Sequence, residues 1–496
     1  MKQLILVFIH GYSVSDLDTY GELPLRLKNE ASARGLQIQI ENIFLGRYIS
    51  FSDDVKLEDV AKALEFAVQQ QIPKDQHFVC ITHSTGGPLA RLWWHLYYQQ
   101  TNRSCAMSHL IMLSPANFGS ALAQLGKTRL SRVKSWFNGI EPGQGILNWL
   151  ELGSSGSWEL NKNWILNGEV PEKENKVFSF VITGQSIDRK LYDHVNSYTG
   201  EIGSDGVVRV CSANLNSTFI KLQQHAPTFE NDVARADQLE IAHYQESSAS
   251  AIRIVKNKSH SGNDMGIMRC VKKETDDHKN DELVQSIFEC ISVNNRDTYH
   301  ELSAKFAQET VAVQAELKIE TDGGLLNKTR YIHDRYAMVI FRVTDTEGNA
   351  ISDFDLLLTA GNNDDPDQLP PGFFADRQRN SLNKNTLTYF FNYDLLIGTA
   401  EVKTKEGEVL RKKTEGIDAL GLKLIAHPDK GFIRYLPCRI RASKELFQKA
   451  LQANRTTLIE ICLQRIVSDQ VFRFEKTPED KIAGDFKDVK PGNVII

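Results

Sequence analysis

The chain has 496 residues, of which 58 are basic and 63 are acidic, so its formal net charge is −5. This length exceeds the roughly 250–300 residues that one hydrophobic core usually holds, so we expect two domains. The balanced charge argues against a protein that binds nucleic acid or another polyanion. The seven cysteines lack the close spacing of a zinc site or a disulfide framework, which favours reduced, buried thiols.

The N-terminus, MKQLILVFIHGY, contains an apolar run at residues 4–9. This run is shorter than the core of a signal peptide, and no cleavage site with small residues follows it. No segment approaches the roughly 20 apolar residues that span a bilayer. We therefore expect a first buried strand here and a protein that is cytoplasmic as synthesised, with any export by a signal-independent route.

Strand and helix signals alternate over the first 300 residues. Strands are predicted at 4–9, 78–82, 109–113 and 177–183, and helices at 54–71 and 88–99. This order predicts an α/β fold with a mostly parallel sheet and helices on both faces. A further helix-like segment follows at 281–293.

The pattern changes after residue 300. Alternating apolar and polar residues predict strands at 311–320, 336–345, 387–396 and 457–466, separated by Gly, Asn and Asp turns. We therefore predict an N-terminal catalytic domain over 1–305 and a C-terminal, β-rich, sandwich-like accessory domain over 306–496.

The segment FVCITHSTGGPLARLWW (78–94) changes from a strand pattern to a helix pattern at Ser84. This arrangement is typical of a nucleophile elbow, in which a tight turn exposes the serine oxygen and the next amide N–H, that of Thr85, points at the oxyanion. Thr82 replaces the usual first glycine and crowds the turn, although Gly86 opposite it relieves the crowding. A loop that only caps the helix is the alternative.

A second motif supports the elbow. His10 and Gly11 end the first predicted strand in FIHGYS, where this kind of fold supplies its other oxyanion donor, which we expect to be the backbone N–H of Tyr12.

An acid and a base should follow the serine in the order Ser, Asp, His. Asp205 lies in a Gly-Ser-Asp-Gly turn beside a predicted apolar strand, and we take it as the acid over Asp188 and Asp193. An ordinary Asp-Gly turn is the alternative interpretation of Asp205.

Three histidines follow Asp205. His260 lies on a loop after the apolar strand at 251–255, which is where a base can face the serine, and we prefer it over His225 and over His243 in a helix-like segment. For His10 and His83, which end strands, packing and hydrogen bonding are the expected roles.

Six short segments carry a family resemblance. They are His10-Gly11, THSTG (82–86), LSPANFGSALA (113–123), LELGS (150–154), SDGVVRVCSA (204–213) and HSG (260–262). Together they resemble the α/β-hydrolase lipases, namely bacterial lipases and the GPI-inositol-deacylase-like branch, over about residues 1–300. The resemblance implies a serine ester hydrolase with Ser84, Asp205 and His260 in the matching places.

These roles define an acyl-enzyme mechanism. His260 takes the proton of Ser84, Asp205 holds the imidazole, and the N–H groups of Tyr12 and Thr85 bind the oxyanion. Such a mechanism requires no metal and no organic cofactor. An acidic turn at 360–372 offers oxygen ligands for calcium, but a solvated loop also explains its composition.

A lid is predicted at about 124–165, where such hydrolases often insert a cap. Basic residues there accompany Trp136, Phe137, Trp149 and Leu150, a composition that suits either a lid on a lipid surface or a helix pair packed in the core.

The leading functional hypothesis is a lipase or phospholipase acting on a lipid or membrane surface. It includes export as an antibacterial effector of the type VI kind, with a secretion-machine or immunity partner on the β domain. The alternatives are a soluble carboxylesterase or peptidase with a small substrate, and a catalytically silent binding module.

Overall fold

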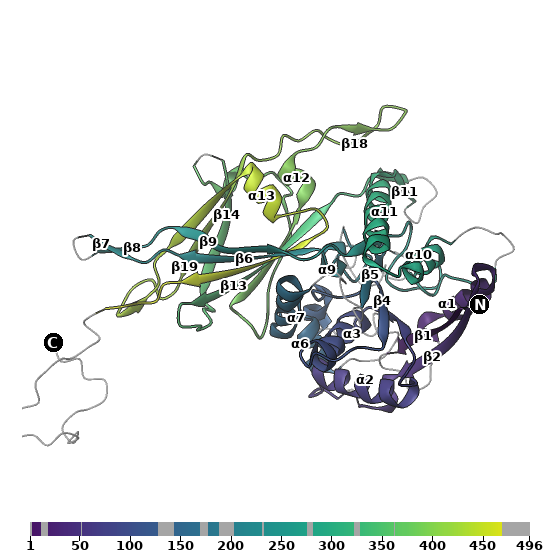
Figure 1. Ribbon diagram of the computed structural model, residues 1–496. Coiled ribbons are helices and arrows are strands. Elements are labelled where there is room, and N and C mark those ends of the chain that lie inside the picture. The colour runs from purple at the N-terminus through teal and green to yellow at the C-terminus, as the bar shows by residue number, and fades with distance from the viewer. Residues whose placement is uncertain are drawn as a thin grey trace, which may run out of the picture.

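The computed structural model describes residues 2–10, 18–50, 52–126, 143–168, 177–187, 203–230, 233–274, 281–321, 328–361 and 363–468. Two bodies lie side by side in Figure 1, a helix-rich one that contains the N-terminus and a β-rich one.

A six-stranded sheet forms the centre of the helix-rich body, with every neighbouring pair of strands parallel and the order β10-β5-β4-β3-β1-β2. Its strands are β1 (Lys2–His10), β2 (Leu36–Phe44), β3 (Phe78–His83), β4 (Met107–Leu113), β5 (Phe178–Thr183) and β10 (Ala251–Ile254). The central strands read as continuous apolar runs because both faces of a parallel sheet are covered.

Helices cover both faces of this sheet. Two helices, α2 (Leu57–Gln71) and α3 (Gly86–Trp94), pack in one core with α6 (Gln144–Leu150), and a π-helical turn at His95–Gln99 continues α3. The opposite core contains α1 (Leu23–Ala31), α10 (Glu282–Ser292) and α11 (Arg296–Ala315). This architecture confirms the predicted α/β-hydrolase class.

The β-rich body contains a mixed six-stranded sheet with the order β15-β16-β13-β22-β6-β9. Its strands are β6 (Ser217–Gln224), β9 (Leu239–Glu246), β13 (Tyr336–Asp345), β15 (Phe374–Arg379), β16 (Thr386–Asn392) and β22 (Thr456–Leu463). One face packs with α7 (Ser155–Asn167) of the helix-rich body. The other face packs on a three-stranded sheet of β14 (Phe354–Ala360), β19 (Ala419–Ala426) and β21 (Cys438–Ser443).

The predicted boundary near residue 305 does not separate the helices and strands of the two bodies. Strands β6 and β9 precede it and yet pair within the second sheet, and α11 crosses it while packing against β10. The two bodies therefore share a stretch of chain in the middle of the sequence.

The remaining elements are short. They are the 3₁₀ turns Asp18–Tyr20, Ser32–Arg34, Leu45–Arg47 and Pro366–Gln368, the helices α4 (Leu122–Gly126), α9 (Val210–Ala213), α12 (Tyr393–Ile397) and α13 (Lys444–Ala450), and the strand pairs β7–β8 (Thr228–Glu230, Val233–Arg235), β11–β12 (Lys318–Thr321, Lys328–Tyr331), β17–β18 (Val402–Lys403, Val409–Arg411) and β20–β23 (Ile433–Arg434, Ile466–Val467). No helix among the described ranges has the length and apolar character needed to cross a membrane.

Some predicted elements are wrong. The segment around His243 is strand β9, not helix, because a bulge in its pairing with β6 lets Ile241 and Tyr244, three residues apart, face the same cavity and imitate helical spacing. Residues 311–315, which begin the strand predicted at 311–320, form the end of α11. The buried side chains of this helix recur every three or four residues, and Val311 is 63% exposed. The predicted strand at 387–396 is strand β16 as far as Asn392, and only its end lies in α12. The apolar segment after Asp205, which was expected to be a strand, contains the short helix α9.

Candidate active site

Ser84 occupies a sharp corner between β3 and α3. Its φ is 54°, a left-handed value that is strained for a residue other than glycine. The neighbouring strand fixes the corner, because the Ser84 N–H donates to the carbonyl of Leu113 (3.0 Å), and the Ser84 carbonyl accepts from Ala116 and Gly87 (3.2 Å each). This conformation is the one that the elbow motif predicts.

Two glycines make the corner possible. A Cβ on Gly86 would lie 3.2 Å from the Cβ of Thr82, and one on Gly87 would lie 2.5 Å from the Cβ of Pro115. Gly86 therefore provides the space that Thr82 takes from the turn. Thr85 follows Ser84 as the N-cap residue of α3.

Ser84, His260 and Asp205 form a hydrogen-bonded row. The Nε2 atom of His260 lies 3.0 Å from the hydroxyl of Ser84, and its Nδ1 atom lies 2.9 Å from a carboxylate oxygen of Asp205. Since the carboxylate accepts, Nδ1 carries the proton, and Nε2 is left to accept from the serine hydroxyl. His260 and Asp205 are fully buried and Ser84 is 8% exposed.

The carboxylate of Asp205 is held ionised. Its other oxygen accepts from the amides of Val207 (3.1 Å) and Val208 (2.8 Å). Burial alone would raise the pKa of Asp205, but the charge and hydrogen bond of His260, the Val208 amide and the Ser114 hydroxyl outweigh burial and lower this pKa. The Asp205 carbonyl also accepts from the backbone N–H of His260 (2.9 Å), which joins the two loops.

The two strand-end histidines make structural contacts. His83 donates from Nε2 to the carbonyl of His260 (3.1 Å), and burial together with the nearby His260 lowers the pKa of His83 to about 3. A neutral His83 therefore helps to position the loop of His260. His10 is buried and hydrogen-bonded through Nε2 to the side chain of Asn42 (2.9 Å).

The loop that carries Asp205 rests on the β-rich body. Arg209, whose side chain is 2% exposed, makes an ion pair with Asp376 of β15 and lies over the ring of Phe390 of β16 (4.1 Å). The carbonyl of Cys211 accepts from the hydroxyl of Thr456 (2.8 Å). Sequence reasoning missed these anchors, because they join residues more than 160 positions apart and no local pattern marks them.

The other histidine candidates lie away from this row. The side chain of His225 is 50% exposed and pairs with Glu240 (3.1 Å), while His243 is exposed on β9. Tyr12, Asp188 and Asp193 lie outside the described residues, so the predicted oxyanion donor of the first loop and the two alternative acids have no described position.

The predicted lid is described in part. Trp149 (5% exposed) and Leu150 (0%) of α6 are buried in the core beside α2 and α3, which favours the core-packing alternative for this helix. Trp136 and Phe137 lie outside the described residues.

At the acidic turn, the carboxylate of Asp364 lies 3.8 Å from Arg439 and 3.7 Å from Arg441. Within the described ranges, no group of three or more His, Cys, Asp or Glu side chains could hold a metal ion.

Comparison with known proteins shows a relative of known structure. No family model matches the chain, and no curated protein sequence matches it. The structure is similar to that of phospholipase PlaB from Legionella pneumophila, with a TM-score of 0.82 and 39% sequence identity over 97% of each chain. A complex of PlaB with thio-NAD gives a TM-score of 0.80 and 39% identity over 97% of this chain and 98% of that chain. The chain therefore belongs to the family of the phospholipase PlaB, and it is a carboxylic ester hydrolase with the α/β-hydrolase fold.

Proposed function

We propose that this protein is a phospholipase that cleaves lipid esters through a Ser84-His260-Asp205 triad. The observation that carries the proposal is the row of two hydrogen bonds, at 3.0 Å and 2.9 Å, that links the serine oxygen to a buried carboxylate. The strained corner at Ser84 supports it, because such strain is typical of a nucleophile held in position by its surroundings.

In the first step, Nε2 of His260 takes the Ser84 proton while the serine oxygen attacks the ester carbonyl. Asp205 keeps the imidazole in the correct tautomer and stabilises its positive charge, and the backbone N–H groups of Thr85 and Tyr12 bind the oxyanion. His260 then gives the proton to the leaving alcohol. Water, activated by the same histidine, releases the fatty acid from Ser84.

A phospholipid is the proposed substrate because PlaB, 39% identical over nearly the whole chain, is a phospholipase. A soluble carboxylesterase acting on a small ester is the second candidate, and the burial of Trp149 and Leu150 favours it by removing part of the predicted lipid-contacting lid. Phospholipid vesicles and a soluble short-chain ester, offered side by side, separate the two.

The test of the nucleophile compares two serine variants. Ser84→Ala should abolish hydrolysis of both substrates and labelling by a fluorophosphonate, with little change in melting temperature. Ser179→Ala is the matched control, because Ser179 is also buried and its hydroxyl has no hydrogen-bond partner in the part of the chain that the structure describes. Turnover retained by Ser84→Ala, or lost equally in the control, would contradict the proposed role.

Export as an antibacterial effector, with a secretion or immunity partner on the β domain, stays a prediction. If it is correct, the protein should be found in the medium of producing cells. The Ser84→Ala variant should still be exported but should no longer be toxic to neighbouring cells. Toxicity that persists in Ser84→Ala would separate that role from hydrolysis.

A further inference from the structure

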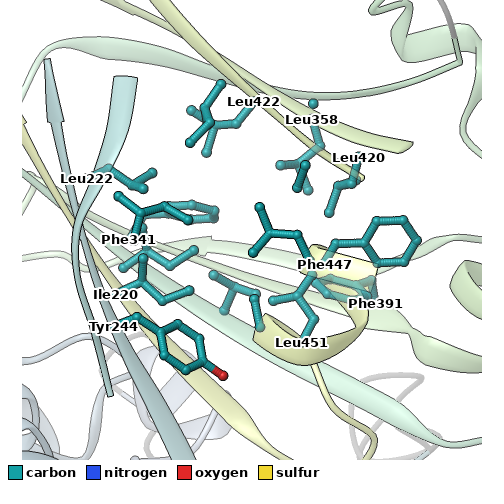
Figure 2. Close-up of a pocket in the computed structure, with 18 residues that line it drawn as sticks. Ile220, Leu222, Tyr244, Phe341, Leu358, Phe391, Leu420, Leu422, Phe447 and Leu451 are labelled. Atoms are coloured by element: carbon teal, nitrogen blue, oxygen red, sulfur yellow. The ribbon is translucent and has the colours of Figure 1, made fainter. Parts of the chain in front are cut away.

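An apolar cavity lies between the two sheets of the β-rich body. Eighteen residues line it, and its empty space is about 700 Å³ with the solvent at its mouth included. Figure 2 shows labelled side chains from both sheets and from α13 pointing into this space.

The lining has the chemistry of a site for a hydrocarbon chain. Tyr244 contributes its only polar side chain, and the deep positions, such as Phe341, Phe391 and Phe447, are at most 1% exposed. Water finds no hydrogen-bond partners on such walls.

The mouth of the cavity lies where β9, β21 and α13 meet. Two short side chains, Ala442 of β21 and Ala450 of α13, are partly exposed there, and Ile241 is 38% exposed. Strand β9 is an edge of the large sheet and β21 is an edge of the small one, so this side of the sandwich is where a ligand can enter.

A positive charge lies beside this mouth. The ammonium group of Lys449 is 4.9 Å from the centre of the Tyr244 ring. The Tyr244 hydroxyl donates to Glu246 (2.8 Å), whose carboxylate also lies 3.6 Å from Arg455. Glu246 is thus engaged by two other groups, and among the described residues Lys449 has no carboxylate partner, which leaves its ammonium available to an incoming anion.

We propose that this cavity binds one long-chain fatty acid, with the hydrocarbon chain between the sheets and the carboxylate at Lys449. An apolar cavity with a cation at its mouth complements this ligand, because the hydrocarbon leaves water while the carboxylate stays at the surface. This site is separate from Ser84. Binding there does not require the proposed hydrolysis, although a lipid ester hydrolase would release the same class of molecule.

The test measures palmitate binding to the full chain carrying Ser84→Ala, so that binding is independent of turnover. Equilibrium dialysis should find a saturable site that Ala442→Phe abolishes, because the added ring fills the mouth. Ala375→Phe is the matched control, since Ala375 is exposed on β15 and does not line the cavity. Ile241→Glu gives a second, surface-tolerated block by placing a negative charge at the mouth. Palmitate binding that survives both substitutions would overturn the proposal.

The charge at the mouth is tested separately with Lys449→Gln. Palmitate affinity should fall about two- to fivefold, the size expected of an exposed charge pair, while the affinity for hexadecanol, which has the same chain and no charge, should not change. An equal loss for both ligands would contradict the assigned orientation. If no palmitate binds and Ala442→Phe instead dissociates a dimer in light scattering, the face belongs to a second copy of the chain and the fatty-acid site is refuted.

Discussion

The two partners of the ion pair between Arg209 and Asp376 differ in burial, so we expect the loss of Asp376 to lower the free energy of unfolding more than the loss of Arg209. The Arg209 side chain is 2% exposed, whereas that of Asp376 is 26% exposed. Asp376→Asn therefore removes a carboxylate from a cation that is itself buried. Arg209→Met leaves a carboxylate that water already reaches. Removing one partner of a buried pair costs about 3–5 kcal/mol, and the partial exposure of Asp376 places Asp376→Asn at about 3 kcal/mol.

Arg209→Met should cost less, about 1 kcal/mol, which is the scale of its lost stacking on Phe390. The double variant should be no less stable than Arg209→Met alone, because the pair is already broken, so the coupling energy should be close to the full cost of Asp376→Asn.

Equilibrium urea unfolding of the parent protein, the two single variants and the double variant measures these differences in the free energy of unfolding. Asp376→Asn should also lower kcat on a short-chain ester, because Arg209 lies four residues after Asp205 on the same loop. Lys413→Gln is the control, since Lys413 and its partner Glu415 are 67% and 82% exposed, and breaking this pair should leave the free energy of unfolding nearly unchanged. A greater loss in Arg209→Met than in Asp376→Asn would refute the reasoning.

Four further substitutions test the site and its surroundings. His260→Ala should lower the rate of ester hydrolysis as far as Ser84→Ala does, while His243→Ala on exposed β9 should leave it nearly unchanged; the reverse result would reassign the base. The pKa of His83, about 3, lies below its ordinary 6.5, so its contribution to stability is complete above pH 6.5 and is lost as the pH falls towards 3. His83→Gln keeps a hydrogen-bond donor for the loop, so its free energy of unfolding in urea should fall less than that of the parent protein between pH 6.5 and 3. An equal fall in both proteins would exclude His83 as the cause. Trp149→Ala should cost about 3–5 kcal/mol in the same assay if α6 is core, whereas a neutral result would restore the lid interpretation.

The sequence was most informative where function depends on local backbone geometry. The corner at Ser84 needs a strand, a tight turn with small residues and a helix within 17 residues, and each part has its own pattern. Parallel strands bring their carboxyl ends to one edge of the sheet, so a serine after β3 and a histidine after β10 could be expected to meet there. The acid was harder to predict from the sequence, because Asp205 precedes a short helix and not the strand that was expected.

Pairing between distant segments was not predictable in the same way. A strand pattern indicates which residues alternate in exposure but not which strand lies beside it. The partners of β6 are β9, 15 residues further on, and β22, more than 230 residues further on. The bulge in β9 removed even the alternation, which is why that strand was taken for a helix.

The path of the chain between Asp205 and His260 explains why the β-rich body matters to the site. After Asp205 the chain passes through α9 into β6, returns along β9 and enters β10, from which His260 follows. The acid and the base are therefore joined by two strands that belong to the other sheet. In a fragment ending at residue 305, β6 would lose its pairing with β22 and would form an isolated hairpin with β9, which is marginally stable in water. Arg209 would also lose Asp376. We therefore expect the C-terminal strands to stabilise the positions of the acid and the base, whatever ligand they bind themselves.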